Sequence, residues 1–110
     1  MSGQTPFNAH NSILTSTGGQ FSKNALPAGA NLVKATPGRV VRLSVLTLGT
    51  AGSLMVNDCA TIGAVSAANT VYEMGFAGAT EGLVVTLEFP CLYGIVVTVP
   101  TGGVVSVSYL

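Results

Sequence analysis

The side chains that could carry out acid–base chemistry are few and scattered. His10 is the only histidine, and the sequence around it implies no nucleophile for it to activate. A general base needs a nucleophile within hydrogen-bond reach and a third group that orients it. Glu73 and Glu88 could supply the carboxylate pair of a glycosidase, which must face one cleft. Both fall at outward positions of expected strands, so solvated or interface-paired charges are the favoured interpretation. We expect no catalytic residues and no enzyme activity.

The ligand sets of metals and cofactors are also missing from the sequence. Calcium sites need a cluster of oxygen ligands, whereas Asn57 and Asp58 stand alone and favour a turn. Cys59 and Cys91 form neither a CxxC motif nor a Cys/His cluster, so zinc is not expected. The first residues show no secretory signal, so we expect two reduced thiols, with a single disulfide as the alternative. Phosphate-binding and dinucleotide-binding motifs are absent from the sequence, and we expect no cofactor.

Three tyrosines, Tyr72, Tyr93 and Tyr109, could in principle stack on sugar rings. An exposed tyrosine on a β-sandwich suits this role because its ring is amphipathic. Each tyrosine belongs to a different part of the expected sheet, and the chain has no tryptophan. Packing in a core or an interface is the favoured interpretation, and a carbohydrate site is the alternative.

Composition indicates one folded domain that belongs to an assembly. The 110 residues suffice for one core, and charged residues make up 7% of the chain against about 25% in an average soluble domain. Apolar residues make up 48%, which argues against disorder. So few charges cannot coat a free monomer, and we expect a homo-oligomer. With four basic and four acidic residues the formal net charge is zero, which gives no footprint for nucleic acid. The uncharged segment 89–110 is broken by proline and glycine, so a membrane helix is not expected.

The strongest structural pattern lies between Gly82 and Pro100. Side chains alternate across a strand, so apolar residues at every second position indicate a sheet with one dry face. This pattern predicts two adjacent strands, and the residues expected to face the core are Leu83, Val85, Leu87 and Phe89 on the first and Ile95, Val97 and Val99 on the second. Further strands are expected at 30–36, 39–48, 53–57, 69–76 and 103–109, with a short strand or a connection at 61–66.

These strands are separated by glycine-rich turns at intervals of about 8–12 residues. Helical periodicity is absent from the sequence. The chain is therefore predicted to be all-β: a compact antiparallel β-sandwich or jelly-roll-like domain of seven or eight strands, covering residues 29–110.

Residues 1–28 differ from the rest because Ser, Thr, Asn, Gln and Gly dominate them. One interpretation is a loose leader without a role. The other is an extended polar arm that becomes ordered on a neighbouring molecule. The candidate partner contacts of this arm are its isolated apolar residues, Phe7, Ile13, Leu14 and Phe21.

From Pro27 onward the chain resembles a group of small virion proteins of tailed phages. The segments that carry the likeness are NLVKATPGRVVRLSV, LGTAGSLMVND, GFAGATEGLVVTL and the closing GGVVSVSYL. Proteins with this layout resemble capsid decoration, or cement, proteins of double-stranded DNA phages. The resemblance implies a β-sandwich, often a homotrimer, made in the host cytoplasm and fixed to the outer surface of the head where major capsid proteins meet. The alternative is a receptor- or carbohydrate-binding β module of a phage fibre, a tail or an adhesin.

Overall fold

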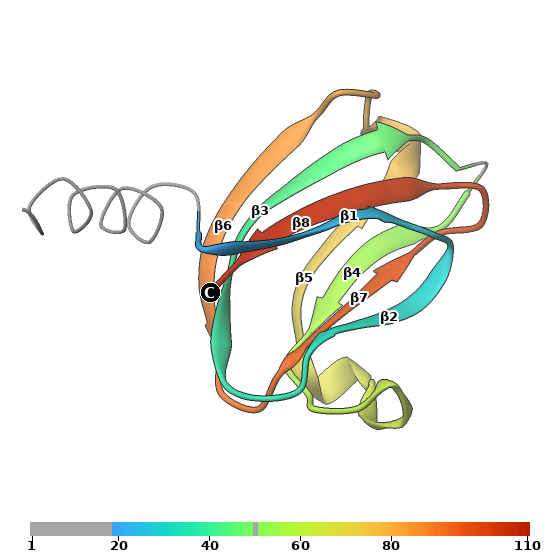
Figure 1. The fold of residues 1–110 in the computed structure, drawn as a ribbon. Helices are drawn as coiled ribbons and strands as arrows, with labels where there is room; N and C mark the ends of the chain where they lie inside the picture. The colour runs from blue at the N-terminus through green and yellow to red at the C-terminus, as the bar shows by residue number, and fades with distance from the viewer. Residues whose placement is uncertain (1–18, 50) are drawn as a thin grey trace, which may run out of the picture.

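A computed structural model describes residues 19–49 and 51–110, and within them the chain forms two antiparallel four-stranded sheets. The first sheet has the order β1-β8-β3-β6 and the second has the order β2-β7-β4-β5, as Figure 1 shows. The strands are β1 (Phe21–Leu26), β2 (Gly29–Lys34), β3 (Gly38–Thr47), β4 (Ser53–Asn57), β5 (Thr70–Gly75), β6 (Val84–Cys91), β7 (Ile95–Val99) and β8 (Val104–Tyr109). The prediction of an all-β sandwich is confirmed.

The core lies between the two sheets and consists mainly of β-branched and leucine side chains. The alternation expected on β7 is confirmed, because Ile95, Val97 and Val99 are all buried in the core cluster. Val105 and Val107 of β8 face the same core from the opposite sheet. Branched side chains at every second position therefore fix which face of each central strand is dry.

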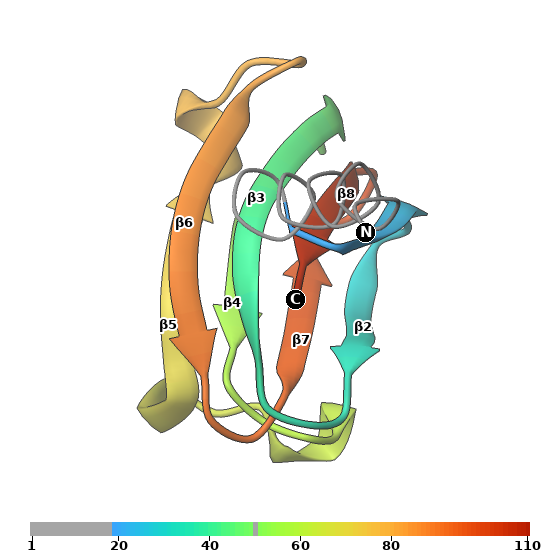
Figure 2. The ribbon, with the colours of Figure 1, turned by 60° about the vertical axis from the view of Figure 1, so that its left-hand side comes forward.

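The two strands expected between Gly82 and Pro100 are present, but they do not pair with each other. β6 pairs with β3 in the first sheet, whereas β7 lies between β2 and β4 in the second. Residues 92–94 therefore carry the chain from one sheet to the other at one end of the sandwich (Figure 2). Periodicity shows which face of a strand is dry but contains no information about the neighbouring strand.

The edge strand β6 departs from the expected pattern near its end. Its pairing with β3 shifts register between Thr86 and Phe89, and Glu88 in this interval has a φ of 49°. A bulge of this kind bends the strand and disrupts the ladder. Leu83 and Val85 before the bulge and Leu87 within it pack against the core, but Phe89 beyond it is 42% exposed. The expectation that Phe89 lies in the core is corrected.

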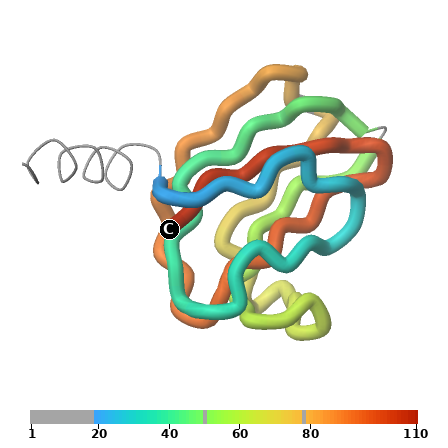
Figure 3. The backbone as a smooth tube through the Cα atoms, in the orientation of Figure 1, coloured from blue at the N-terminus to red at the C-terminus, as the bar shows by residue number. Residues whose placement is uncertain are grey.

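The sandwich begins at Phe21 and not at residue 29, so the boundary of the proposed arm is also corrected. β1 pairs with β8, the Phe21 ring lies 5.7 Å from that of Tyr109, and Leu26 is buried. The backbone tube then turns directly from β1 into β2, which closes one side of the sandwich (Figure 3). Phe7, Ile13 and Leu14 lie outside the described residues.

The segment 61–66 is a connection and not a strand. Two short 3-10 turns, η1 (Ile62–Ala64) and η2 (Ala67–Asn69), lie between β4 and β5, and a third, η3 (Phe76–Gly78), follows β5. Within the part of the chain that the structure describes, no helix has the length and apolar character needed to cross a membrane.

Candidate binding surfaces

Three connections meet at one end of the sandwich: the β2–β3 turn, the β4–β5 excursion (residues 58–69) and the β6–β7 turn (residues 92–94) (Figure 1). Gly94 lies at their junction. A Cβ atom added to it would collide with the carbonyl oxygen of Cys59 and would lie 2.7 Å from that of Lys34. Since the three backbones approach this closely, only glycine fits there.

The Asp58 carboxylate holds the β6–β7 turn in place. Its oxygens accept the backbone N–H groups of Leu92 at 2.8 Å, Tyr93 at 2.8 Å and Gly94 at 3.3 Å. Partial burial of Asp58 raises the pKa of this carboxyl, but the three N–H donors outweigh the burial and leave its pKa below the ordinary value. Asp58 is therefore an ionised structural acceptor, which clamps the turn to the end of β4.

A second network fixes the β4–β5 excursion. The Asn57 amide is buried and donates to the Ser66 carbonyl at 3.0 Å, to Asn69 Oδ1 at 2.8 Å and to Thr70 Oγ1 at 3.0 Å. The Asn69 amide in turn donates to the Ala64 carbonyl at 2.8 Å and accepts the Ser66 N–H at 3.1 Å. Side-chain bonds of this kind take the place of a regular ladder. These bonds therefore fix the conformation of the β4–β5 excursion, which lies beside the β6–β7 turn.

Two large apolar side chains project from the clamped turn. Leu92 is 69% exposed and Tyr93 is 67% exposed, which are the highest values among the described large apolar residues. Tyr93 also lines a cavity of about 360 Å³ together with Asp58, Cys59, Ala60, Thr61, Ala64 and Asn69. The polar atoms of Asp58 and Asn69 are already bonded within the chain. This surface, which we call the β6–β7 end, therefore offers apolar contact and ring stacking.

The two cysteines have a structural role at this end of the sandwich, and neither is a reactive thiol. Both are buried free thiols, and Cys59 Sγ donates to the Thr61 carbonyl at 3.4 Å. Burial raises the pKa of Cys91 to about 11, and the nearby Asp58 and Cys59 add to the rise. Burial also raises the pKa of Cys59; the bond to the Thr61 carbonyl lowers it by less, and the Asp58 charge adds a still smaller rise. Since the thiolate is the nucleophile, both thiols are unreactive at neutral pH.

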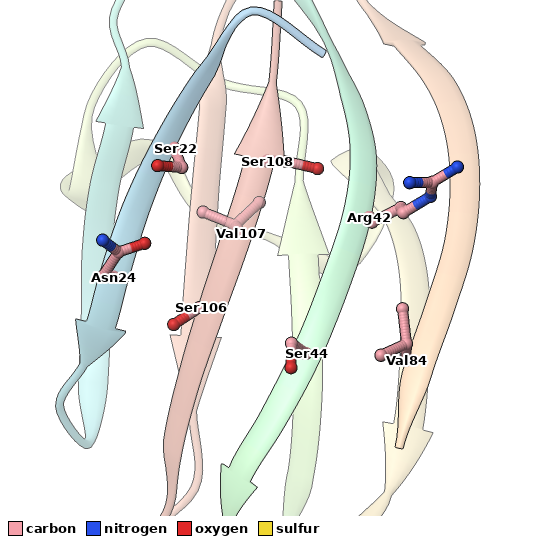
Figure 4. A pocket seen from close by; sticks show the side chains of 8 residues that line it. All are labelled: Ser22, Asn24, Arg42, Ser44, Val84, Ser106, Val107 and Ser108. Carbon is pink, nitrogen blue, oxygen red and sulfur yellow. The ribbon is translucent and has the colours of Figure 1, made fainter. Parts of the chain in front are cut away.

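A second candidate surface lies on the outer face of the first sheet. Figure 4 shows a shallow pocket there, whose volume is about 250 Å³ and whose lining residues are Ser22, Asn24, Arg42, Ser44, Val84, Ser106, Val107 and Ser108. Ser106 Oγ accepts the Ala25 N–H at 2.9 Å, whereas the buried Ser108 Oγ has no partner. Arg42 and the serine hydroxyl groups of this pocket could hydrogen-bond a ligand, but none of the lining residues is aromatic.

The structure does not bring the acidic residues of the sequence analysis into one site. Glu73 lies exposed on β5 and Glu88 lies exposed on β6, in different sheets, and neither lines the two cavities described above. His10 lies outside the described residues. Tyr72 and Tyr109 pack against the core, which leaves Tyr93 as the exposed tyrosine.

Within residues 19–49 and 51–110, no group of three or more His, Cys, Asp or Glu side chains is placed to hold a metal ion. Comparison of the chain with protein-family profiles, with curated proteins and with solved structures found no match.

Proposed function

We propose that this protein is a non-catalytic structural subunit of a phage virion, a cement protein that binds the outer surface of the capsid. Its partners are the major capsid protein and further copies of itself, with the trimer as the form that the family resemblance implies. The observation that carries the proposal is the clamped turn, in which Asp58 holds Leu92 and Tyr93 out into solvent.

A rigid turn with exposed apolar side chains suits a docking surface for physical reasons. Association is opposed by the ordering of loops and side chains, and this cost falls when the turn is already fixed. Binding energy is concentrated in a few large residues, among which tyrosine is enriched. On a capsid, neighbouring contacts also act together, so modest individual energies produce firm attachment.

The test is cosedimentation of the purified protein with heads of the encoding phage that lack it. Leu92→Ser combined with Tyr93→Ser is expected to weaken binding about 100-fold, because each side chain loses roughly 1.5 kcal/mol of apolar burial. The matched control is Leu46→Ser, since Leu46 is 47% exposed on β3 but lies outside this turn. Equal binding of the double variant and the control would refute the role of the β6–β7 end.

The arm hypothesis requires a truncation before β1. Removal of residues 1–18 is expected to leave the thermal unfolding midpoint within about 3 °C of wild type, because β1 begins at Phe21 and Gln20 N–H already donates to the Tyr109 carbonyl. Affinity for heads is expected to fall, because the candidate contacts Phe7, Ile13 and Leu14 are removed. Removal of residues 1–25 would also delete most of β1 and is the control for loss of the fold. Unchanged head binding by the shorter truncation would contradict the arm.

One observation favours the alternative, a receptor- or carbohydrate-binding module. Tyr93 stands beside the cavity of about 360 Å³, and an exposed tyrosine can stack on a sugar ring. Titration with a panel of glycans, followed by NMR shifts of residues 58–64 and 93, separates the two functions. Saturable shifts that disappear in Tyr93→Ala, together with no binding to heads, would favour this alternative.

A further inference from the structure

The pocket on the outer face of the first sheet is formed by the register of three neighbouring strands. Ser108 on β8 is the cross-strand partner of Ser22 on β1 and of Arg42 on β3. Ser106, the next outward residue of β8, is the partner of Ser44 on β3. Side chains of directly opposite residues lie on the same face of a sheet. The pairing of the strands therefore gathers these polar side chains in two adjacent rows.

Arg42 gives this pocket its charge. It is the single charged residue among those that line the pocket, and its side chain is exposed. Figure 4 shows its guanidinium over β6. An arginine presents its N–H donors in a fixed planar fork, which matches the two oxygens of a carboxylate. A pocket with one positive charge and no acidic side chain therefore favours a ligand that carries one negative charge.

The serine hydroxyl groups of the pocket can form hydrogen bonds beyond those within the chain. Ser106 Oγ accepts the Ala25 N–H at 2.9 Å, and its own O–H can still donate. Ser108 Oγ is shielded from solvent, has no partner among the described residues and points toward β3 in Figure 4. A buried hydroxyl without a partner is rare in folded proteins, and a water or a ligand commonly accounts for it. Because hydroxyl groups both donate and accept, they suit the hydroxyl groups of a ligand.

The size of the pocket limits the ligand to a small one. Its volume is about 250 Å³, which is below the roughly 300–1,000 Å³ of pockets that hold drug-sized ligands. Val84 is 54% exposed at the β6 side of the pocket and offers an apolar contact for C–H groups. A single ring or short chain that carries both a carboxylate and hydroxyl groups fits this lining.

We propose that this pocket binds a small hydroxy acid, a class to which the sugar acids belong. Arg42 binds the carboxylate, the hydroxyl groups of Ser44 and Ser106 bond those of the ligand, and Val84 contacts its carbon atoms. The pocket is formed by one copy of the chain and contains neither Leu92 nor Tyr93. Ligand binding here is therefore independent of the proposed attachment to heads.

Titration of the purified full chain with glucuronate, followed by amide NMR shifts, tests the proposal. Saturable shifts of the pocket residues are expected, with a dissociation constant of about 1 mM. Glucose has the same ring without the carboxylate, and acetate has the carboxylate without the hydroxyl groups. Each is expected to bind about tenfold more weakly than glucuronate, because each lacks one of the two sets of hydrogen bonds.

Arg42→Gln is expected to weaken glucuronate binding about tenfold, because the charge-assisted hydrogen bonds of the guanidinium are lost. Arg42 is exposed, and the amide spectrum verifies that the variant is folded. Arg39→Gln is the matched control, since Arg39 carries the same charge on the same strand but donates to the Glu88 carbonyl and does not line the pocket. It is expected to change the affinity by less than about twofold.

Three results would overturn the proposal: no saturable shifts at the pocket, equal glucuronate affinity in the two arginine variants, or acetate binding as tight as that of glucuronate. Cosedimentation of Arg42→Gln with heads keeps the two proposals apart. Unchanged head binding is expected, because the variant leaves the β6–β7 end intact. Loss of head binding together with loss of glucuronate binding would overturn the independence of the pocket.

Discussion

Val97→Asp is expected to abolish folding. Val97 is fully buried in the core and lies on β7, which is paired on both sides, with β2 and with β4. An unpaired carboxylate at this position costs several kcal/mol, a large part of the 5–15 kcal/mol that stabilises a typical domain. The expected result is a loss of the β-sheet circular dichroism signal and collapsed dispersion of amide NMR shifts.

Val84→Asp is the control for this experiment. Val84 has the same side chain as Val97 but is 54% exposed on the edge strand β6, so its replacement is expected to leave the domain folded. A soluble and folded Val97→Asp variant would contradict the position of the core.

Asp58→Ala is expected to lower the free energy of unfolding by about 2–3 kcal/mol, because hydrogen bonds to a charged group contribute about 1.5–3 kcal/mol each and solvent replaces some of them. The backbone N–H groups of Leu92, Tyr93 and Gly94 all lose their acceptor. Urea denaturation measures the loss. Glu73→Ala, which removes an exposed carboxylate from β5, is expected to change the stability by less than about 0.5 kcal/mol.

The pH dependence of this clamp has a definite sign. The pKa of Asp58 is lower in the folded protein than its ordinary value, so the unfolded chain binds the proton first as the pH falls. The stabilisation is present above the ordinary aspartate pKa of about 4 and is lost progressively as the pH falls from there through the lower pKa of the folded state. Asp58→Asn, which cannot ionise, is expected to lose less stability between pH 5 and pH 3 than wild type. Parallel acid curves would show that Asp58 is not the linked group.

Much of the fold could be predicted because local alternation determines which face of a strand is buried. Ile95, Val97 and Val99 follow this rule without exception. The partners of a strand are set by long-range pairing, so the separation of β6 and β7 into different sheets could not be predicted. β1 escaped prediction for a local reason: its register shifts between Lys23 and Leu26, Ala25 has a φ of 54°, and most of its side chains are exposed.

Less of the candidate site than of the fold could be predicted from the sequence. Asn57 and Asp58 indicated a turn, whereas the Asp58 carboxylate bonds backbone groups 34–36 residues away. No local sequence pattern predicts that a carboxylate accepts hydrogen bonds from residues so far away along the chain. The sequence did not indicate that Leu92 and Tyr93 are exposed, because apolar residues beside a buried strand are usually part of the core.

The proposed docking of the β6–β7 end on a capsid is tested by site-specific photocrosslinking on intact virions that carry the protein. A benzophenone amino acid replaces Tyr93 in one variant and Ser22, on the outer face of the first sheet, in the other. If the β6–β7 end docks on the capsid, position 93 is expected to crosslink to the major capsid protein, with little or no crosslink from position 22. A capsid crosslink from position 22 alone, or no crosslink to any virion protein from position 93, would contradict it.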